Sequence, residues 1–290
     1  MGKNDTFEDQ LAHMRPRLHR YCARMAGSVI DGEDLVQEVL TRAVTARSAG
    51  KRIDNLEGWL LRVAHNASID LLRQRARANL VPLDEEEMQS SVEPMPQSEV
   101  AAISFRRLLE LPALQRCAVV LKDVLGHSIE EIADIADCSP IAAKSALQRG
   151  RTRLREIALR DEGDALLPLL AGNERRRLRA YVDAFRTGEF DVIRRMLSND
   201  VSVDLVNRLQ LTGRAAIGSY FTRYAEAKQW RYALGAVDGQ PAMLVYDSGH
   251  PSHRPAHFVV IDWCNDTIIG IRDFLYAAYA MEGADWVLLE

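Results

Sequence analysis

The stretch from Ser128 to Arg155 constrains the fold of this chain most, because it has the pattern of two short helices joined by a tight turn. Ser128 and Glu131 have the spacing of a capping box, which marks the start of a helix. Ser139 then precedes Pro140 as an N-cap residue precedes a proline at a first helical position, so a second helix should begin at Pro140. The pattern predicts a helix-turn-helix unit.

The second of these helices has an apolar side and a basic side. Ala143, Leu147 and Leu154 recur at helical spacing. Between Lys144 and Arg155 there are five basic residues and no acid. A basic helical face can hold phosphates and reach base edges, so we expect this helix to lie on DNA. The alternative is a solvated basic helix end without a partner.

Apolar residues at helical spacing predict three further helices before this unit, over 7–26, from Asp31 or Asp34 onward, and from about Leu56 onward. The second of them has an exposed acidic side, which consists of Glu33, Asp34, Gln37 and Glu38. Trp59 lies near the start of the third helix, where a large aromatic residue is usually a packing anchor rather than a platform for a base.

The character of the sequence changes after the third helix. Residues 81–97 contain three prolines, five acids and no basic residue. Such a composition buries too little apolar surface to fold alone, so it predicts a flexible acidic tether. Helical periodicity resumes at Val100 and continues to Gly126, a predicted C-cap. The first 160 residues are therefore expected to form two all-helical modules on a tether.

The pattern changes again after the short connector 161–172. Helices are predicted over 175–185, 186–197 and 213–224. Strands are predicted over 201–206, 230–237, 242–246, 256–263 and 267–274. Asp238-Gly239 lies between two alternating apolar runs, which is a strong signal for a hairpin turn. These elements predict an α+β cone with an antiparallel sheet.

Composition limits the function classes. A chain of 290 residues can hold two or three domains, and its net charge of −4 means that any DNA contact must come from local basic patches. The four cysteines lie far apart without a C-x-x-C pair, so we expect buried thiols and neither a metal nor a cofactor. No apolar run approaches the ~20 residues that span a bilayer, and the first residues lack a hydrophobic signal core. We expect a cytoplasmic protein without a membrane partner.

Three ordered motifs resemble the extracytoplasmic-function (group IV) sigma factors of bacterial RNA polymerase. DGEDLVQEVLTRA (31–43) is similar to the region 2 helix that docks on the polymerase clamp. NLEGWLLRVAHNASIDLLRQRAR (55–77) is similar to the part of region 2 that melts and reads the −10 element. The stretch from LPALQRC to RTRLRE (111–156) is similar to region 4, which reads the −35 element. The resemblance covers residues 5–158.

This resemblance implies roles for individual residues. For the −35 element the implied contacts are Lys144, Ser145, Gln148, Arg149, Arg151, Arg153 and Arg155, of which the last three arginines would hold phosphates. For the −10 element they are Asn55, Arg62, Asn66, Asp70 and Arg73, beside a loop (51–58) that captures a flipped base. For the polymerase clamp they are Asp34, Gln37 and Glu38. The family often has Arg and His where this chain has Ala146 and Gln148, so its −35 preference should differ from that of its relatives.

The C-terminal part, over 174–282, is similar to SnoaL-like domains of the nuclear-transport-factor-2 superfamily, and a sigma factor with this appendage resembles the SigJ-type subgroup. Relatives of the fold include enzymes that use Asp or His inside the cone. His257 and Asp262 should face opposite sides of one strand, which argues against a catalytic dyad. We therefore expect a regulatory domain rather than an enzyme. A small-molecule ligand would occupy a pocket made by Trp230, Tyr246, Asp262 and Asp273.

The expected organisation has five parts: sigma region 2 (1–80), an acidic linker (81–99), sigma region 4 (100–160), a connector (161–173) and the SnoaL-like domain (174–290). The leading hypothesis is an initiation factor that binds core RNA polymerase and promoter DNA under control of its own C-terminal domain. The first alternative is a helix-turn-helix operator-binding regulator that works without polymerase. The second is a cone-type enzyme tethered to DNA-binding modules.

Overall fold

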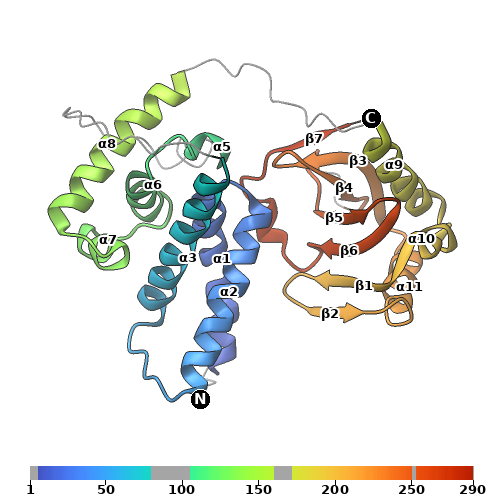
Figure 1. Cartoon of the computed structure of the whole chain (residues 1–290), viewed down its shortest axis with the longest axis horizontal. Helices are drawn as coiled ribbons and strands as arrows, with labels where there is room; N and C mark the ends of the chain where they lie inside the picture. Colours follow the sequence, from blue (N-terminus) through green and yellow to red (C-terminus); the bar gives the residue numbers. More distant parts are fainter. Residues whose placement is uncertain (1–5, 80–104, 160–171, 250–252, 290) are drawn as a thin grey trace. The chain divides into compact units, whose positions relative to one another are not determined.

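The computed structural model describes residues 6–79, 105–159, 172–249 and 253–289 (Figure 1). The chain forms two compact units, a first up to residue 162 and a second from residue 163, and each is described by itself. The predicted acidic linker (81–99) and residues 161–171 of the predicted connector lie outside the described residues.

Three long helices form the first module of the first unit: α1 (Phe7–Ala26), α2 (Val29–Ser48) and α3 (Leu56–Asn79). Contacts among all three bury a common apolar core, which contains the side chain of Leu18 from α1. The predicted start of α2 at Asp31 or Asp34 is wrong. The hydroxyl of Ser28 accepts hydrogen bonds from the amides of Ile30 and Asp31, so the helix begins earlier, at Val29.

The second module contains α5 (Phe105–Leu108), α6 (Ala113–Val119), a π-helical turn η1 (Val120–Val124), α7 (Ile129–Ala136) and α8 (Pro140–Leu159). The predicted capping box is confirmed: the Glu131 amide donates to the Ser128 hydroxyl at 3.1 Å, and the Ser128 amide donates to the Glu131 carboxylate at 2.7 Å. The predicted start of α8 at Pro140 is also confirmed. The helix-turn-helix is thus α7 and α8.

Close packing between α6 and α8 fixes the second module. Gly150 of α8 lies so near α6 that an added Cβ would come within 2.8 Å of Val119 Cγ2 and 3.0 Å of the Gln115 carbonyl oxygen. The predicted apolar residues Ala143, Leu147 and Leu154 are buried. Because these three side chains point into the interior of the module, the opposite side of α8 points outward.

The second unit combines helices with a seven-stranded sheet in the order β2-β1-β6-β5-β4-β3-β7. Its helices are α9 (Gly172–Thr187), α10 (Phe190–Met196), α11 (Gly218–Glu226) and the 3-10 turn η2 (Ala278–Met281). Its strands are β1 (Leu197–Leu205), β2 (Leu209–Thr212), β3 (Trp230–Val237), β4 (Gln240–Asp247), β5 (His257–Cys264), β6 (Thr267–Asp273) and β7 (Trp286–Leu288).

The predicted α+β class is confirmed, but the sheet is mixed rather than antiparallel. Strands β1 and β6 pair in parallel, with Val203 opposite Ile271. The hairpin turn at Asp238-Gly239 is confirmed, since Asp238 and Gly239 have positive φ angles of 49° and 80° between paired β3 and β4. The short strands β2 and β7 were not predicted, and α11 begins at Gly218 rather than at residue 213.

Aromatic rings fill the space between the helices and one face of this sheet. Phe185 of α9 lies 5.2 Å, ring centre to ring centre, from both Phe190 and Tyr224, in edge-on geometry. These residues belong to one buried cluster that also contains Val259 and Ile261 of β5. Side chains from the helices and from the sheet therefore pack against one another in the interior of the second unit.

Candidate nucleic-acid interface

The outer face of α8 carries most of the basic side chains that the sequence predicts to contact DNA. Lys144, Gln148 and Arg153 are exposed, and Ser145, Arg149 and Arg155 are half-buried. Ala146 is fully buried, so it belongs to the packed side of α8 and cannot face the major groove. The N-terminal part of a recognition helix normally contacts base edges, and in this chain that part also has Ile141, which is 80% exposed.

Arg151 differs from the other arginines of α8. Its guanidinium donates two hydrogen bonds to the Asp123 carboxylate, with Nε at 2.9 Å and Nη2 at 2.5 Å. The Asp123 side chain is only 5% exposed, and the same bonds raise the pKa of Arg151 above its usual value. A two-pronged pair of this kind joins α8 to η1. The structure therefore gives Arg151 a role inside the module, and the phosphate contact that the resemblance implied stays a prediction.

The predicted −10 residues form one outward-facing row on α3. Asn55 accepts a hydrogen bond from the Gly58 amide at 3.0 Å and so caps the helix. From Arg62, seven residues further on, the row continues at intervals of three or four residues through exposed side chains, namely Arg62, Asn66, Asp70 and Arg73. The prediction that Trp59 is a core anchor is wrong, because it is half-buried and Lys51 Nζ lies 5.5 Å from its ring centre.

The predicted polymerase-binding residues also lie on a helical surface. Asp34 and Glu38 of α2 are exposed, and Gln37 is half-buried. The neighbouring Glu33 was predicted to share this exposed side, but its side chain is 1% exposed and forms an ion pair with Arg15 of α1. The acidic side of α2 is therefore narrower than the sequence predicts.

A buried joint connects the two modules of the first unit. The hydroxyl of Tyr21 lies 2.9 Å from His65 Nδ1 and donates to Cys117 Sγ at 3.4 Å. The Tyr21 hydroxyl has one proton, which it donates to Cys117. It can therefore only accept a hydrogen bond from His65, and this requires that neutral His65 carries its proton on Nδ1. Burial lowers the pKa of His65 to about 4 and raises that of the Cys117 thiol to about 12, so both groups stay uncharged at neutral pH.

Arg116 of α6 supplies a charge to the same joint. Its guanidinium donates to the carbonyl of Met25 at 2.5 Å and to the carbonyl of Leu111 at 3.1 Å, and burial lowers its pKa to about 10. These bonds partly offset the cost of burying a cation.

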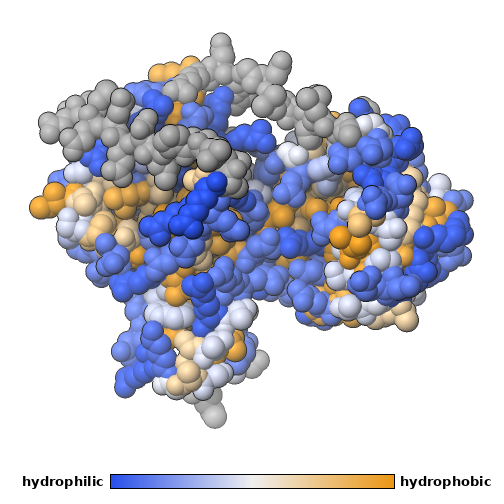
Figure 2. Space-filling model, in the orientation of Figure 1, coloured by the Kyte–Doolittle hydropathy of each residue, from blue (hydrophilic) through white to orange (hydrophobic). Residues whose placement is uncertain are grey.

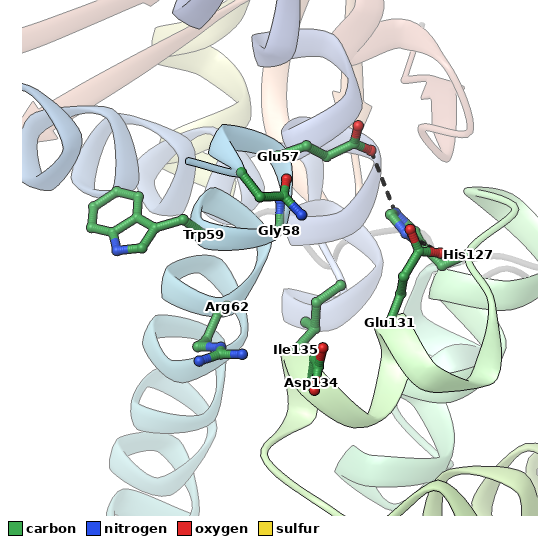
Figure 3. A pocket seen from close by; sticks show the side chains of 9 residues that line it. Glu57, Gly58, Trp59, Arg62, His127, Glu131, Asp134 and Ile135 are labelled. Carbon is green, nitrogen blue, oxygen red and sulfur yellow. Dashed lines mark hydrogen bonds and ion pairs between the residues drawn. The ribbon is translucent and has the colours of Figure 1, made fainter. Parts of the chain in front are cut away.

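The rim of the joint is charged and surrounds a cavity of about 340 Å³ between α3 and α7 (Figure 3). Arg17 of α1 forms an ion pair with Glu57 of α3 at 2.5 Å and donates to the Leu125 carbonyl at 2.7 Å. The Nε2 atom of His127 lies 3.5 Å from Oε1 of Glu57, and its Nδ1 atom lies 3.5 Å from Oε2 of Glu131. Sequence analysis missed this rim, because its residues come from both modules and no periodic signal connects them.

The four residues predicted to line a ligand pocket in the second unit lie on two different faces of the sheet. Trp230 and Asp273 lie on the sheet face that meets the helices, whereas Tyr246 and the exposed Asp262 lie on the opposite face, as strand alternation requires. The sequence missed a buried polar network instead. The Tyr224 hydroxyl donates to Asp273 at 2.7 Å and lies 3.0 Å from His257 Nε2, and burial lowers the pKa of His257.

Hydrophilic residues cover most of the face of the molecule that is shown in Figure 2. In the part of the chain that the structure describes, no helix is long and apolar enough to cross a membrane. Within the same described ranges, no three His, Cys, Asp or Glu residues are grouped so that they could hold a metal ion.

Comparison with protein families matches the two helical modules. Residues 11–78 match sigma-70 region 2, and residues 105–154 match sigma-70 region 4. The first match covers α3 as far as residue 78, with its outward-facing row, and the second covers α7 and the part of α8 up to residue 154.

Individual relatives extend this similarity. The RNA polymerase sigma factor CarQ of Myxococcus xanthus is 33% identical, over 54% of this chain and 91% of that protein. The ECF RNA polymerase sigma factor SigG of Mycobacterium tuberculosis is 27% identical, over 92% of this chain and 81% of that protein.

Two solved structures are also similar. The Mycobacterium tuberculosis extracytoplasmic function sigma factor SigJ is 18% identical, with a TM-score of 0.36, and covers 92% of this chain and 95% of its own. The sigma factor RpoE of Bartonella quintana, solved with the anti-sigma factor NepR, is 26% identical, with a TM-score of 0.41, and covers 53% of this chain and 98% of its own.

Proposed function

This chain belongs to the extracytoplasmic-function sigma factors of RNA polymerase, and we propose that it starts transcription from two-part promoters under the control of its own C-terminal domain. Sigma factors bind RNA polymerase and DNA, and their family is not enzymatic. The finer assignments concern which surfaces make these contacts and what the second unit does.

The observation that carries this proposal is the pair of outward-facing rows on α3 and α8. The row from Asn55 to Arg73 supports contact with the −10 strand, since it offers amide and guanidinium groups from exposed positions. The outer face of α8, with Lys144 and Gln148, supports reading of the −35 element in the major groove. The row on α3 lies within the matched region 2, and Lys144 and Gln148 lie within the matched region 4.

Two further assignments complete the proposal. The exposed acidic side of α2, with Asp34 and Glu38, docks on a basic surface of core polymerase, where such charges set orientation and association rate. The second unit, with residues 174–290, modulates activity. It acts by holding the two sigma modules in a given arrangement, in place of a separate anti-sigma partner, and the protein works in the cytoplasm.

A gel shift with and without core polymerase tests the proposal against a conventional operator-binding regulator. We expect weak binding of promoter duplex by the free chain and a stable complex when core polymerase is added. Tight, sequence-specific binding by the free chain that core polymerase does not change would contradict the proposal. It would support the regulator instead.

A further inference from the structure

Ile141 is a large apolar side chain that the fold leaves in solvent. It is 80% exposed in the first turn of α8, whereas the neighbouring Ala143 is fully buried. Among the described residues, only Leu159 is a more exposed large apolar residue, and it lies at the far end of the same helix. Ile141 therefore adds little to the packing of the module, and its apolar surface is available to a partner.

This side chain lies on the face of α8 that is proposed to read the −35 element. Lys144 and Ser145 follow Ile141 by three and four residues, and Gln148 follows it by seven, so all four side chains share one side of the helix. Helical side chains lean toward the N-terminus of their helix, so Ile141 extends this face by about one turn, ~5 Å. The N-terminal part of a recognition helix is the part that contacts base edges.

The first turn of α8 holds Ile141 in a fixed position. The Ala142 amide donates to the Ser139 hydroxyl at 3.1 Å, and the Ala143 amide donates to the Ser139 carbonyl at 2.9 Å. Ser139 thus caps the helix. An isoleucine in a helix has one strongly preferred χ1 rotamer, so Ile141 loses little conformational entropy when it makes a contact.

The major groove offers one apolar group to such a side chain, the C5-methyl group of thymine, among base-edge donors and acceptors. The charge around Ile141 also favours DNA as the partner. Lys144 and Arg149 lie beside it on α8, and between Lys144 and Arg155 the helix has no acid. Cations at these positions attract phosphates, which an apolar protein surface lacks.

We propose that Ile141 selects a thymine in the −35 element by contact with its C5-methyl group. The inference rests on the proposed function, because that function places the outer face of α8 in the major groove. It adds an apolar contact at the start of the helix to the polar contacts expected from Lys144 and Gln148. Ile141 is not among the residues to which the resemblance gives a role.

Deoxyuridine tests this contact, because it differs from thymidine only by the missing C5-methyl group. In a mapped promoter, each thymine of the −35 element, on either strand, is replaced in turn by deoxyuridine. Run-off transcription is then measured with core polymerase and the full-length chain. The proteins are wild type, Ile141→Ala and the matched control Leu159→Ala, which shortens an exposed apolar side chain at the other end of α8.

With wild type and with Leu159→Ala, we expect deoxyuridine at one position to lower transcription about two- to fivefold, as the loss of one methyl contact allows. With Ile141→Ala, the same replacement should have no effect. Wild type that is insensitive at every position would overturn the contact, and so would an Ile141→Ala chain that keeps the sensitivity. A much larger loss for Ile141→Ala on all templates would mean that the side chain contacts another surface, and would also overturn it. If wild type gives no transcripts from any promoter, the proposed function fails instead.

Discussion

At the scale of single residues, the pair between Arg151 and Asp123 distinguishes this arginine from the neighbouring basic residues of α8 that are proposed to contact DNA. Arg151→Ala leaves the Asp123 carboxylate buried without its partner, so we expect the free energy of unfolding to fall by about 3 kcal/mol. Arg153→Ala is the matched control on the same helix. It removes an exposed arginine and should change stability by less than about 0.5 kcal/mol. Urea unfolding distinguishes the two, and equal stabilities would contradict the assignment.

Gln148 tests the outer face of α8 at the same scale. Because its amide is exposed where the helix would meet base edges, Gln148→Ala should change which −35 sequences are used rather than weaken all of them. Transcription from a library of −35 variants measures this preference, with Arg153→Ala, at a position expected to hold a phosphate, as the comparison. A uniform loss over all promoters for Gln148→Ala would show that this face of the helix does not read bases.

His65 makes stability depend on pH. Its pKa falls from 6.5 in the unfolded chain to about 4 in the folded one, so between these values the unfolded state binds the extra proton. Stability is therefore lost as pH falls from 6.5 to 4, by at most about 3 kcal/mol. In His65→Gln this contribution is absent. The unfolding free energy of wild type should therefore fall relative to that of the variant as the pH is lowered from 6.5 to 4. A difference between the two proteins that stays constant over this range would refute the expectation.

At the scale of elements, the contact between α6 and α8 depends on a missing side chain. Gly150→Ala adds a methyl group that meets Val119 and the Gln115 carbonyl. We expect a net loss of about 1–2 kcal/mol in unfolding free energy, although alanine favours a helix by about 1 kcal/mol over glycine. Gly218→Ala in α11 is the control, since nothing lies within 4 Å of the added atom. If both variants are stabilised, the helices are less tightly packed than described.

The start of a helix could be predicted from the sequence where neighbouring residues in the chain determine it. The capping box at Ser128 and the proline at Pro140 placed α7 and α8 correctly, because both signals act over three or four residues. Helix α2 was placed too late, because Ser28 follows a glycine and was read as part of the break. The strands β2 and β7 are four and three residues long, too short to show a period.

Long-range partners could not be predicted from the sequence. Strand β1 pairs with β6 in parallel although about 70 residues separate Val203 from Ile271, and strand periodicity carries no information about such a partner. The contact of Glu57 with His127 could not be predicted for the same reason, since the two residues lie far apart in the sequence. The rows on α3 and α8 were predictable because each lies on a single helix.

At the scale of the whole molecule, the proposed control by the second unit predicts a large effect of its removal. A chain that ends at residue 173 keeps both sigma regions and should start transcription at a rate several-fold different from that of the full chain. Circular dichroism of the shortened chain shows whether its helices remain. Comparable transcription from a folded short chain and the full chain would exclude a regulatory role for residues 174–290.

Run-off transcription with purified core enzyme shows whether the chain directs core RNA polymerase to promoters. Over a genomic promoter library, we expect transcripts that appear only when the chain is added and whose start sites share a two-part upstream motif. An absence of promoter-dependent transcripts across that library would contradict it.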